Sequence, residues 1–229
     1  MLTRDGGGNL YGTTLGGGTA NSGVVYKLGP GGNFTVLYNF PTPGYGTPYS
    51  GVVLDSAGNL YGTTTGVQGA GTVYKLDPAG HYTLLYAFPN GGLPWGGVIR
   101  DASGNLYGTT ATGGPRSSGV VYELDSAGHY RELHAFSDGL DGAKSYGSLI
   151  RDKAGNLYGT ANEGGTGGKG VVFMLDPAGN YTVLYNFTGG ADGGNPFAGV
   201  VTDASGGLYG TAAIGGTKTS GVMYKLNAR

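Results

Sequence analysis

One short motif recurs along this chain, and it limits the possible folds more than any other feature. Gly-Asn-Leu-Tyr-Gly-Thr begins at residues 8, 58, 104 and 155, and a variant with Gly207 in place of Asn begins at residue 206. A second motif, Gly-Val-Val-Tyr-Lys-Leu or a close variant, follows every copy. A third motif, an alternating aromatic and aliphatic segment that ends in Phe, follows only the first four. This register predicts five copies of one structural unit.

Each unit is expected to contain four short strands. In the second unit, residues 51–55 form an apolar run before a turn, and residues 59–64 are rich in Leu, Tyr and Thr. Residues 72–77 form a further β-rich run that ends in Asp-Pro-Ala-Gly, and residues 81–88 alternate with the period of two that is typical of a half-buried strand. No stretch of ten residues has helical periodicity. The unit is therefore interpreted as an antiparallel meander.

Repeated four-stranded units of this length are typical of β-propeller blades. We predict an all-β, five-bladed β-propeller in which the last blade has three strands, because the fifth unit lacks the third motif. Residues 1–229 would form a single domain, with repeats of about 1–47, 48–93, 94–145, 146–195 and 196–229. A linear solenoid is less favoured, since it needs polar end repeats and neither end is more polar than the middle.

Closure of such a ring would depend on side-chain packing between the first and fifth blades. Two alternatives stay open: the chain is part of a longer array, or the open edge at Gly221–Leu226 pairs with a second copy. The expected state is a monomer or an edge-paired homodimer.

Composition excludes several other classes of protein. Gly and Pro number 52 and 10, a content that suggests disorder, but 38% of residues are hydrophobic and only 12% are charged. The net charge is −1 without a basic cluster, which argues against a nucleic-acid partner. Cys is absent, and no apolar run is long enough to span a membrane. The first residues include no apolar stretch of the kind found in signal peptides.

The meander assigns the loops to two faces. Turns between the first and second strands, and between the third and fourth strands, share one face and are nearly identical in every unit. The other face carries the loops that differ between repeats, and loops of this kind are where repeat scaffolds place function. A ligand site is therefore expected on the variable face.

The combination of these motifs resembles the GloVer tandem repeat of bacterial surface proteins of the choice-of-anchor kind. The resemblance extends over nearly the whole chain and implies a propeller-like fold. It also implies an extracellular or cell-surface setting for the parent protein, which would carry a separate anchor. It implies no catalytic residues.

Aromatic side chains on the variable face are the best candidates for ligand binding. An aromatic residue recurs shortly before the first strand of blades two to five, and the longest of these loops adds another. Flat rings of this kind stack on sugars, whereas their regular recurrence also suits a structural role in the seams between blades. The candidate residues are Tyr45, Tyr49, Trp95, Tyr146 and Phe197. Trp95 and Tyr45 are the strongest of them.

The acidic and histidine residues give a weaker signal. Eight of the 14 acids lie at equivalent turn positions, where capping of the turn is the expected role. Asp138 and Asp141 lie on the variable face and are added to the ligand candidates, with Ca²⁺ as a less favoured ligand. His81 and His129 occupy one turn position, and His134 replaces a Tyr in the fourth strand. No spacing indicates a catalytic group, a metal centre or a cofactor site.

The sequence thus predicts a non-catalytic β-propeller scaffold or binding module. It would be a natural segment of a bacterial surface protein or an engineered derivative, with a glycan or another protein as partner. Lectin-like glycan binding through the aromatic loops is the alternative. A glycoside-active enzyme is less favoured, because no carboxylate pair stands apart from the turn acids.

Overall fold

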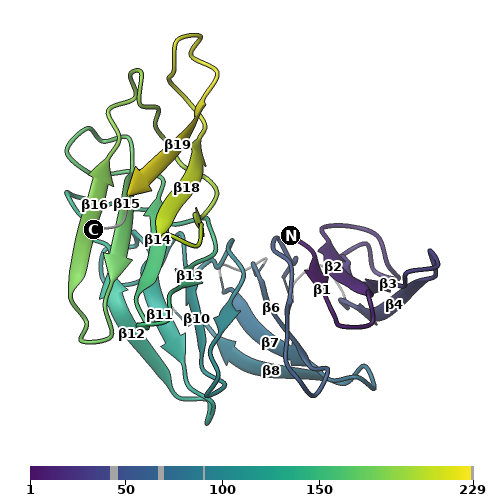
Figure 1. Cartoon of the computed structure of the whole chain (residues 1–229). Helices are drawn as coiled ribbons and strands as arrows, with labels where there is room; N and C mark the ends of the chain where they lie inside the picture. The colour runs from purple at the N-terminus through teal and green to yellow at the C-terminus, as the bar shows by residue number, and fades with distance from the viewer. Residues whose placement is uncertain (42–45, 67–69, 90, 228–229) are drawn as a thin grey trace.

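The computed structural model describes residues 1–41, 46–66, 70–89 and 91–227. Within these ranges the chain forms nineteen β-strands and no helix. The strands make five antiparallel sheets of four, four, four, four and three strands, each in the order of the sequence (Figure 1). The predicted all-β fold of five blades, with a three-stranded last blade, is confirmed.

The four strands of a blade differ in length. The first has only two residues, and the others have four to six. Blade one contains β1 (Thr3–Arg4), β2 (Leu10–Thr14), β3 (Val24–Leu28) and β4 (Phe34–Asn39), and blade two contains β5 (Val53–Leu54), β6 (Leu60–Thr64), β7 (Thr72–Leu76) and β8 (Tyr82–Ala87). Blade three contains β9 (Ile99–Arg100), β10 (Leu106–Thr109), β11 (Val120–Leu124) and β12 (Tyr130–Ala135), and blade four contains β13 (Ile150–Arg151), β14 (Leu157–Ala161), β15 (Val171–Leu175) and β16 (Tyr181–Asn186). Blade five contains β17 (Val201–Thr202), β18 (Gly207–Ala212) and β19 (Val222–Asn227).

A tight turn, held together by the side chain of an Asp, connects the first two strands of each blade. In blade two, Gly58 has a φ of +86°, a left-handed conformation that favours glycine, and its N–H donates to the carbonyl of Asp55 at 3.1 Å. The Asp55 carboxylate accepts hydrogen bonds from the backbone N–H and side-chain amide of Asn59 at 2.8 and 2.9 Å, and from the hydroxyl of Tyr61 at 3.0 Å. The Asp, Gly, Asn and Tyr of the repeat therefore act together as one turn.

Apolar side chains of neighbouring blades form the core. Four clusters join blades one and two, two and three, three and four, and four and five. Between blades three and four, for example, Phe136 and Val121 pack with Leu149, Phe173 and Leu175, all at most 2% exposed. Because burial of apolar area drives this association, each blade depends on its neighbours for stability.

The Thr of the first motif donates a hydrogen bond from each of the first four blades to the backbone just before the next blade. Thr63 Oγ1 donates to the carbonyl of Gly96 at 3.0 Å, and Thr109 Oγ1 donates to the carbonyl of Gly147 at 3.1 Å. Thr13 and Thr160 make the equivalent bonds to Ser50 and Ala198. Thr211 of the last blade is exposed instead.

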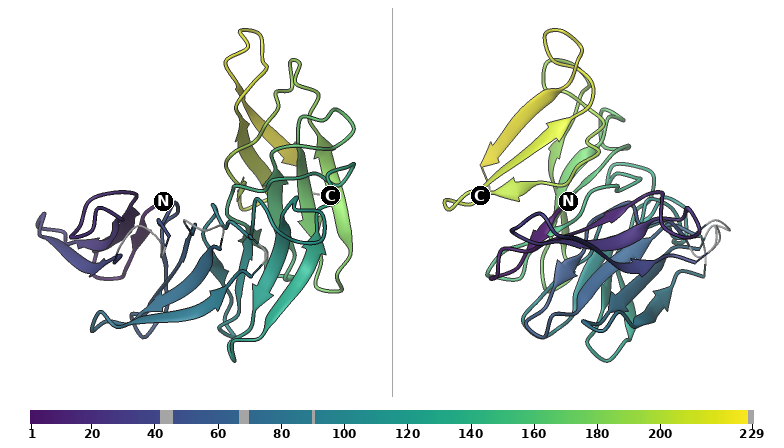
Figure 2. Two further views of the ribbon diagram at one scale, coloured as in Figure 1. Left: turned by 180° about the vertical axis from the view of Figure 1, so that it is seen from behind. Right: turned by 90° about the vertical axis from the view of Figure 1, so that its right-hand side faces the viewer.

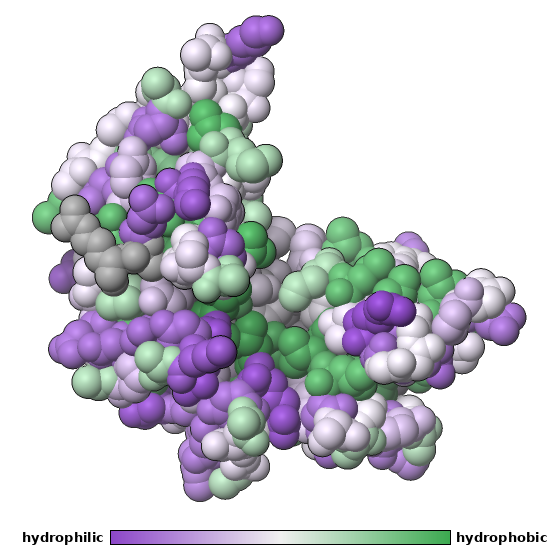
Figure 3. All heavy atoms as spheres, viewed as in Figure 1, coloured by the Kyte–Doolittle hydropathy of each residue, from purple (hydrophilic) through white to green (hydrophobic). Residues whose placement is uncertain are grey.

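The five blades form an open arc, so the expected packing of blade one on blade five does not occur. β1–β4 and β18–β19 lie at separate ends of the arc (Figures 1 and 2), and hydrophobic surface lines the notch between them (Figure 3). Met223 is 81% exposed on blade five, whereas the equivalent Val73 is fully buried. Phe34 is 58% exposed on blade one. None of the four clusters joins these two ends within the described residues.

Candidate functional site

The loops that differ between repeats gather on one face, as the meander predicts. Backbone bridges join the loop before a blade to the loop between its second and third strands. They pair Thr47 with Thr65 in blade two and Gly194 with Ile214 in blade five. On the opposite face, the two kinds of tight turn adjoin each other, since Gly58 lies against Pro78.

Four aromatic residues form a continuous cluster on the variable face. Each lies four residues before the first strand of its blade, so the arc brings equivalent positions together. The ring centroids of Tyr49 and Trp95 are 4.3 Å apart, those of Trp95 and Tyr146 5.7 Å, and those of Tyr146 and Phe197 5.4 Å. These residues, which we call the aromatic cluster, come from four different blades.

The aromatic cluster borders an open cavity of about 330 Å³. Tyr49 is 46% exposed and Phe197 is 57% exposed, while Trp95 and Tyr146 are half-buried. The rings therefore contact one another and still present surface to solvent. Apolar walls with exposed aromatic faces are typical of small-ligand sites.

An adjoining cavity of about 490 Å³ extends from the cluster along the inner strands. Its polar side chains are Ser50 and Ser148, and Met1 and Val201 contribute from the two ends of the arc. None of the residues that line it is Asp, Glu, His, Lys or Arg. The described surface of both cavities is therefore aromatic, aliphatic or hydroxyl-bearing, with backbone from several glycines.

The remaining candidates do not join this cluster. Tyr45 lies outside the described residues. Asp138 is exposed and has a φ of +61°, and Asp141 caps its own loop. The Asp141 carboxylate accepts hydrogen bonds from the backbone N–H and hydroxyl of Ser137 and lies 3.1 Å from Nε2 of His134. Neither Asp lines the cavities at the aromatic cluster. The structure therefore places both Asp residues apart from the aromatic cluster.

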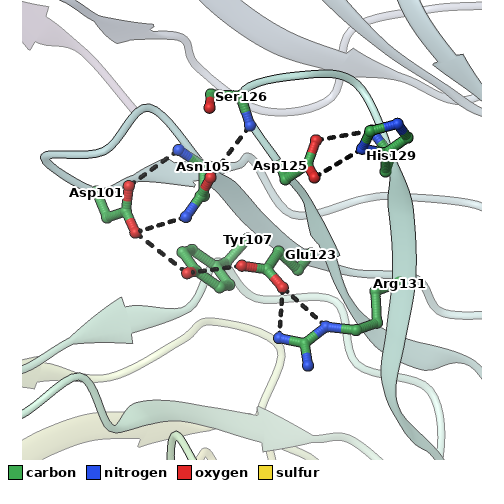
Figure 4. A network of polar contacts seen from close by, with 8 residues as sticks. All are labelled: Asp101, Asn105, Tyr107, Glu123, Asp125, Ser126, His129 and Arg131. Carbon is green, nitrogen blue, oxygen red and sulfur yellow. Dashed lines mark hydrogen bonds and ion pairs between the residues drawn. The ribbon is translucent and has the colours of Figure 1, made fainter.

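The turn acids have the structural role expected for them. Asp101 Oδ1 accepts from the backbone N–H of Asn105 at 2.9 Å, and Oδ2 lies 3.1 Å from both the Asn105 amide and the Tyr107 hydroxyl (Figure 4). Tyr107 also lies 3.0 Å from Glu123, which pairs with Arg131. Burial together with the Glu123 hydrogen bond raises the pKa of Tyr107 to about 12. This network therefore stabilises the turn face.

The histidines also follow the sequence interpretation. His81 and His129 pair with the turn acids Asp77 and Asp125 at 2.8 and 2.9 Å. His134 stacks on Tyr181 with ring centroids 3.8 Å apart. Burial lowers the pKa of His134 despite the nearby Asp141, which suits packing of a neutral ring.

Acid should weaken the fold through the turn carboxylates. Partial burial opposes ionisation of Asp101, but hydrogen bonds from Asn105 and Tyr107 outweigh it, so the pKa of this carboxyl is lowered on folding. A carboxyl with a lowered folded-state pKa contributes stability above its unfolded pKa of about 3.9 and loses it as the pH falls further. We expect a small decrease in melting temperature as the pH falls through about 6.5, because the lowered pKa of His134 opposes protonation of the folded ring, and a further decrease below about pH 4 from the turn carboxylates.

The substitution Asp101→Asn should reduce this acid dependence, as measured by circular dichroism melts between pH 7 and 2.5. A melting temperature that rises between pH 5 and 3 would contradict the assignment.

The sequence interpretation missed a second concave region, on the turn side between blades three and four. This groove of about 190 Å³ is lined by Tyr107, Arg131, Arg151 and Asp176, among others. The Arg151 guanidinium lies 5.8 Å from the centroid of Tyr107, and Arg100 lies similarly over Tyr61 in the preceding pair of blades. The Ile-Arg-Asp sequence shared by blades three and four is the signal that points to it. Both arginines of this groove already have partners, since Arg131 pairs with Glu123 and Arg151 lies over Tyr107, so the groove is the weaker candidate.

Other kinds of site find little support. No group of three or more His, Cys, Asp or Glu side chains within the described ranges is placed to hold a metal ion. The part of the chain that the structure describes also has no helix long and apolar enough to cross a membrane.

Known proteins resemble this chain in sequence motif and in fold. The model of the Gloeobacter/Verrucomicrobia repeat matches residues 65–229. The extracellular domain of a B. thetaiotaomicron protein has a TM-score of 0.61 and 11% identity, with coverage of 99% of this chain and 27% of that chain. A gluconolactonase from Xanthomonas campestris has a TM-score of 0.56 and 15% identity, with coverage of 88% of this chain and 68% of that chain. This chain therefore spans about a quarter of the first protein and two thirds of the second.

These structural likenesses show the propeller fold alone, because identity is low. No curated protein sequence matches this chain. The family match extends over most of the described blades, and its repeat is the one the motifs resemble. The chain therefore belongs to the Gloeobacter/Verrucomicrobia repeat family.

Proposed function

We propose that this chain is a non-catalytic propeller module that binds a ligand at the aromatic cluster. The observation that carries the proposal is the convergence of four rings from four blades on one open cavity. A purely structural seam would bury these rings, whereas Tyr49 and Phe197 keep about half of their surface exposed. The arrangement supports recognition of a flat or ring-shaped apolar face.

A neutral glycan is the ligand that this chemistry suits best. Sugar rings present C–H faces that stack on aromatic side chains, and their hydroxyls need hydrogen-bond partners at the edge of the stack. The hydroxyls of Tyr49 and Tyr146 and the indole N–H of Trp95 lie in the cluster, and Ser50 and Ser148 line the adjoining cavity. A protein partner inserting an apolar side chain is the other candidate.

Glycoside hydrolysis has less support. That chemistry needs two carboxyl groups flanking the bond to be broken. The described linings of the two cavities contain no Asp or Glu, and the turn acids lie on the opposite face in hydrogen bonds to the backbone. These observations favour binding over catalysis.

A cell-surface setting fits the same proposal. The B. thetaiotaomicron protein that shares this fold is an extracellular domain, and the motifs resemble repeats of bacterial surface proteins. A glycan-binding module in this setting would contact polysaccharide outside the cell.

Trp95 offers a direct test, because it is the only tryptophan in the chain. Glycan binding should change its fluorescence in a saturable manner, and a glycan array should identify the preferred sugar. Trp95→Ala should abolish binding while lowering the free energy of unfolding by only about 1–2 kcal/mol, since the ring is half-buried. Phe34→Ala, at an exposed ring on blade one, is the matched control and should bind normally. If neither the Trp95 fluorescence nor the glycan array responds to any sugar, the glycan proposal is wrong.

A further inference from the structure

The seam between neighbouring blades is built around a group of four aromatic rings. Two come from the fourth strand of one blade and the residue directly after it, and two come from the third and fourth strands of the next. Blades one and two use Tyr38, Phe40, Tyr74 and Tyr82, blades two and three use Tyr86, Phe88, Tyr122 and Tyr130, and blades three and four use His134, Phe136, Phe173 and Tyr181.

The first residue of the fourth strand occupies the centre of each group. Tyr181 stacks on His134 of the preceding blade at 3.8 Å and on Phe173 of its own blade at 5.3 Å. Its hydroxyl donates to the backbone carbonyl of Asp141 at 2.6 Å. Tyr181 is therefore held by two rings and one hydrogen bond.

The seam between blades four and five has three of the four rings. Phe187 meets Tyr224 edge to face at 5.0 Å, as Phe136 meets Phe173 at 5.6 Å. Tyr185 bonds to Asp192 at 3.0 Å, as His134 bonds to Asp141. Blade five has no fourth strand within the described residues, so the central ring is missing. Tyr224 is only half-buried, although Tyr74, Tyr122 and Phe173 are fully buried.

The backbone at the same seam also offers hydrogen-bonding groups to a further strand. A Phe at the end of the fourth strand donates its N–H to a Gly carbonyl at the start of the third strand in all four complete blades, at 2.9–3.1 Å. Gly221 is the equivalent glycine in blade five. β19 forms the outer edge of its sheet, beyond β18 (Figure 1). An extended peptide can therefore add to β19 by strand pairing.

The geometry points to β19 and the rings of Tyr185, Phe187 and Tyr224 as an acceptor site for one further extended strand. The strand it fits has the sequence of the repeat's own third motif, in which a leading Tyr enters the vacant centre and a closing Phe bonds to Gly221. This inference does not depend on the proposed ligand at the aromatic cluster, which lies elsewhere on the molecule.

The probe is a capped peptide with the sequence of residues 180–187, Asn-Tyr-Thr-Val-Leu-Tyr-Asn-Phe. Calorimetric titration of the full chain should show saturable one-to-one binding. Replacing the peptide's Tyr181 by Ala should weaken binding at least about tenfold, because both stacks are lost. Replacing it by Phe should weaken binding about two- to tenfold through loss of one hydrogen bond. Methylating the Phe187 nitrogen should also weaken binding, while a scrambled peptide should not bind.

Variants of the protein locate the site. Tyr185→Ala should weaken binding by a similar factor, whereas Tyr185→His should retain it, because His134 performs this role in blade three. Tyr86→Ala alters an occupied seam and should leave peptide affinity unchanged. Amide exchange at Val222–Leu226 should slow when peptide is bound.

Three results would overturn the inference. They are absence of saturable binding, equal affinity for the Tyr181→Ala peptide, and exchange protection confined to the outer edges of β4, β8, β12 and β16.

Discussion

Replacing Gly119 by Ala is expected to lower the free energy of unfolding by about 2–5 kcal/mol. Gly119 directly precedes β11 and has a φ of +93°, and a Cβ there would lie 2.1 Å from the carbonyl oxygen of Thr110. Backbone on both sides fixes this contact, since Gly119 donates to Gly113 and accepts from Phe136. The added methyl group must therefore break the start of the strand or distort the adjoining loop. Chemical denaturation followed by circular dichroism measures the loss.

Gly128→Ala is the matched control. Gly128 has a similar φ of +90°, but a Cβ at this turn position would meet no atom within 4 Å. The control therefore carries only the cost of the left-handed backbone, about 1–2 kcal/mol. Equal losses for the two variants would show that the close approach at Gly119 contributes nothing.

Phe136→Ala is expected to lower the free energy of unfolding by about 3–5 kcal/mol. Phe136 is 1% exposed at the seam of blades three and four, where its ring lies 5.6 Å from that of Phe173 and 6.2 Å from that of Tyr181. Removing the ring leaves a cavity that both blades border. We expect a large decrease in the denaturation midpoint, measured by circular dichroism.

Phe34→Ala, measured in the same way, tests whether the cost of Phe136→Ala comes from burial of the ring and not from loss of a Phe as such. Phe34 is exposed on blade one, and among the described residues its one ring contact is with Tyr26 of its own blade. Its loss should cost less than about 1 kcal/mol. A cost similar to that of Phe136 would mean that another surface covers blade one in solution, which would contradict the open arc.

Much of the architecture could be predicted because the repeat carries its own turn chemistry. Asp55, Gly58 and Asn59 define one tight turn locally, and the period of two in residues 81–88 defines one strand. These features need no information from distant residues. The aromatic cluster was also predictable, since Tyr49, Trp95, Tyr146 and Phe197 share one register and any arc of blades brings equal registers together.

Other features depend on distances that a repeat pattern does not contain. The bulge in each pairing of third and fourth strands, such as that between Val172 and Phe173, leaves no mark in the motifs. The conformation of each loop likewise sets where its residues lie. Asp141 therefore caps its own loop, whereas Trp95 lines the cavity. The groove at Arg151 arises only where two blades meet.

By itself, the sequence determined the number of blades, the strands within each and the face on which the loops vary, because these follow from local periodicity and turn residues. Only the tertiary structure decided that the arc stays open and which aromatic rings meet between neighbouring blades. The physical reason is that the rotation between packed blades comes from the shapes of the buried side chains in contact. The four rotations between successive blades then set whether the ends meet.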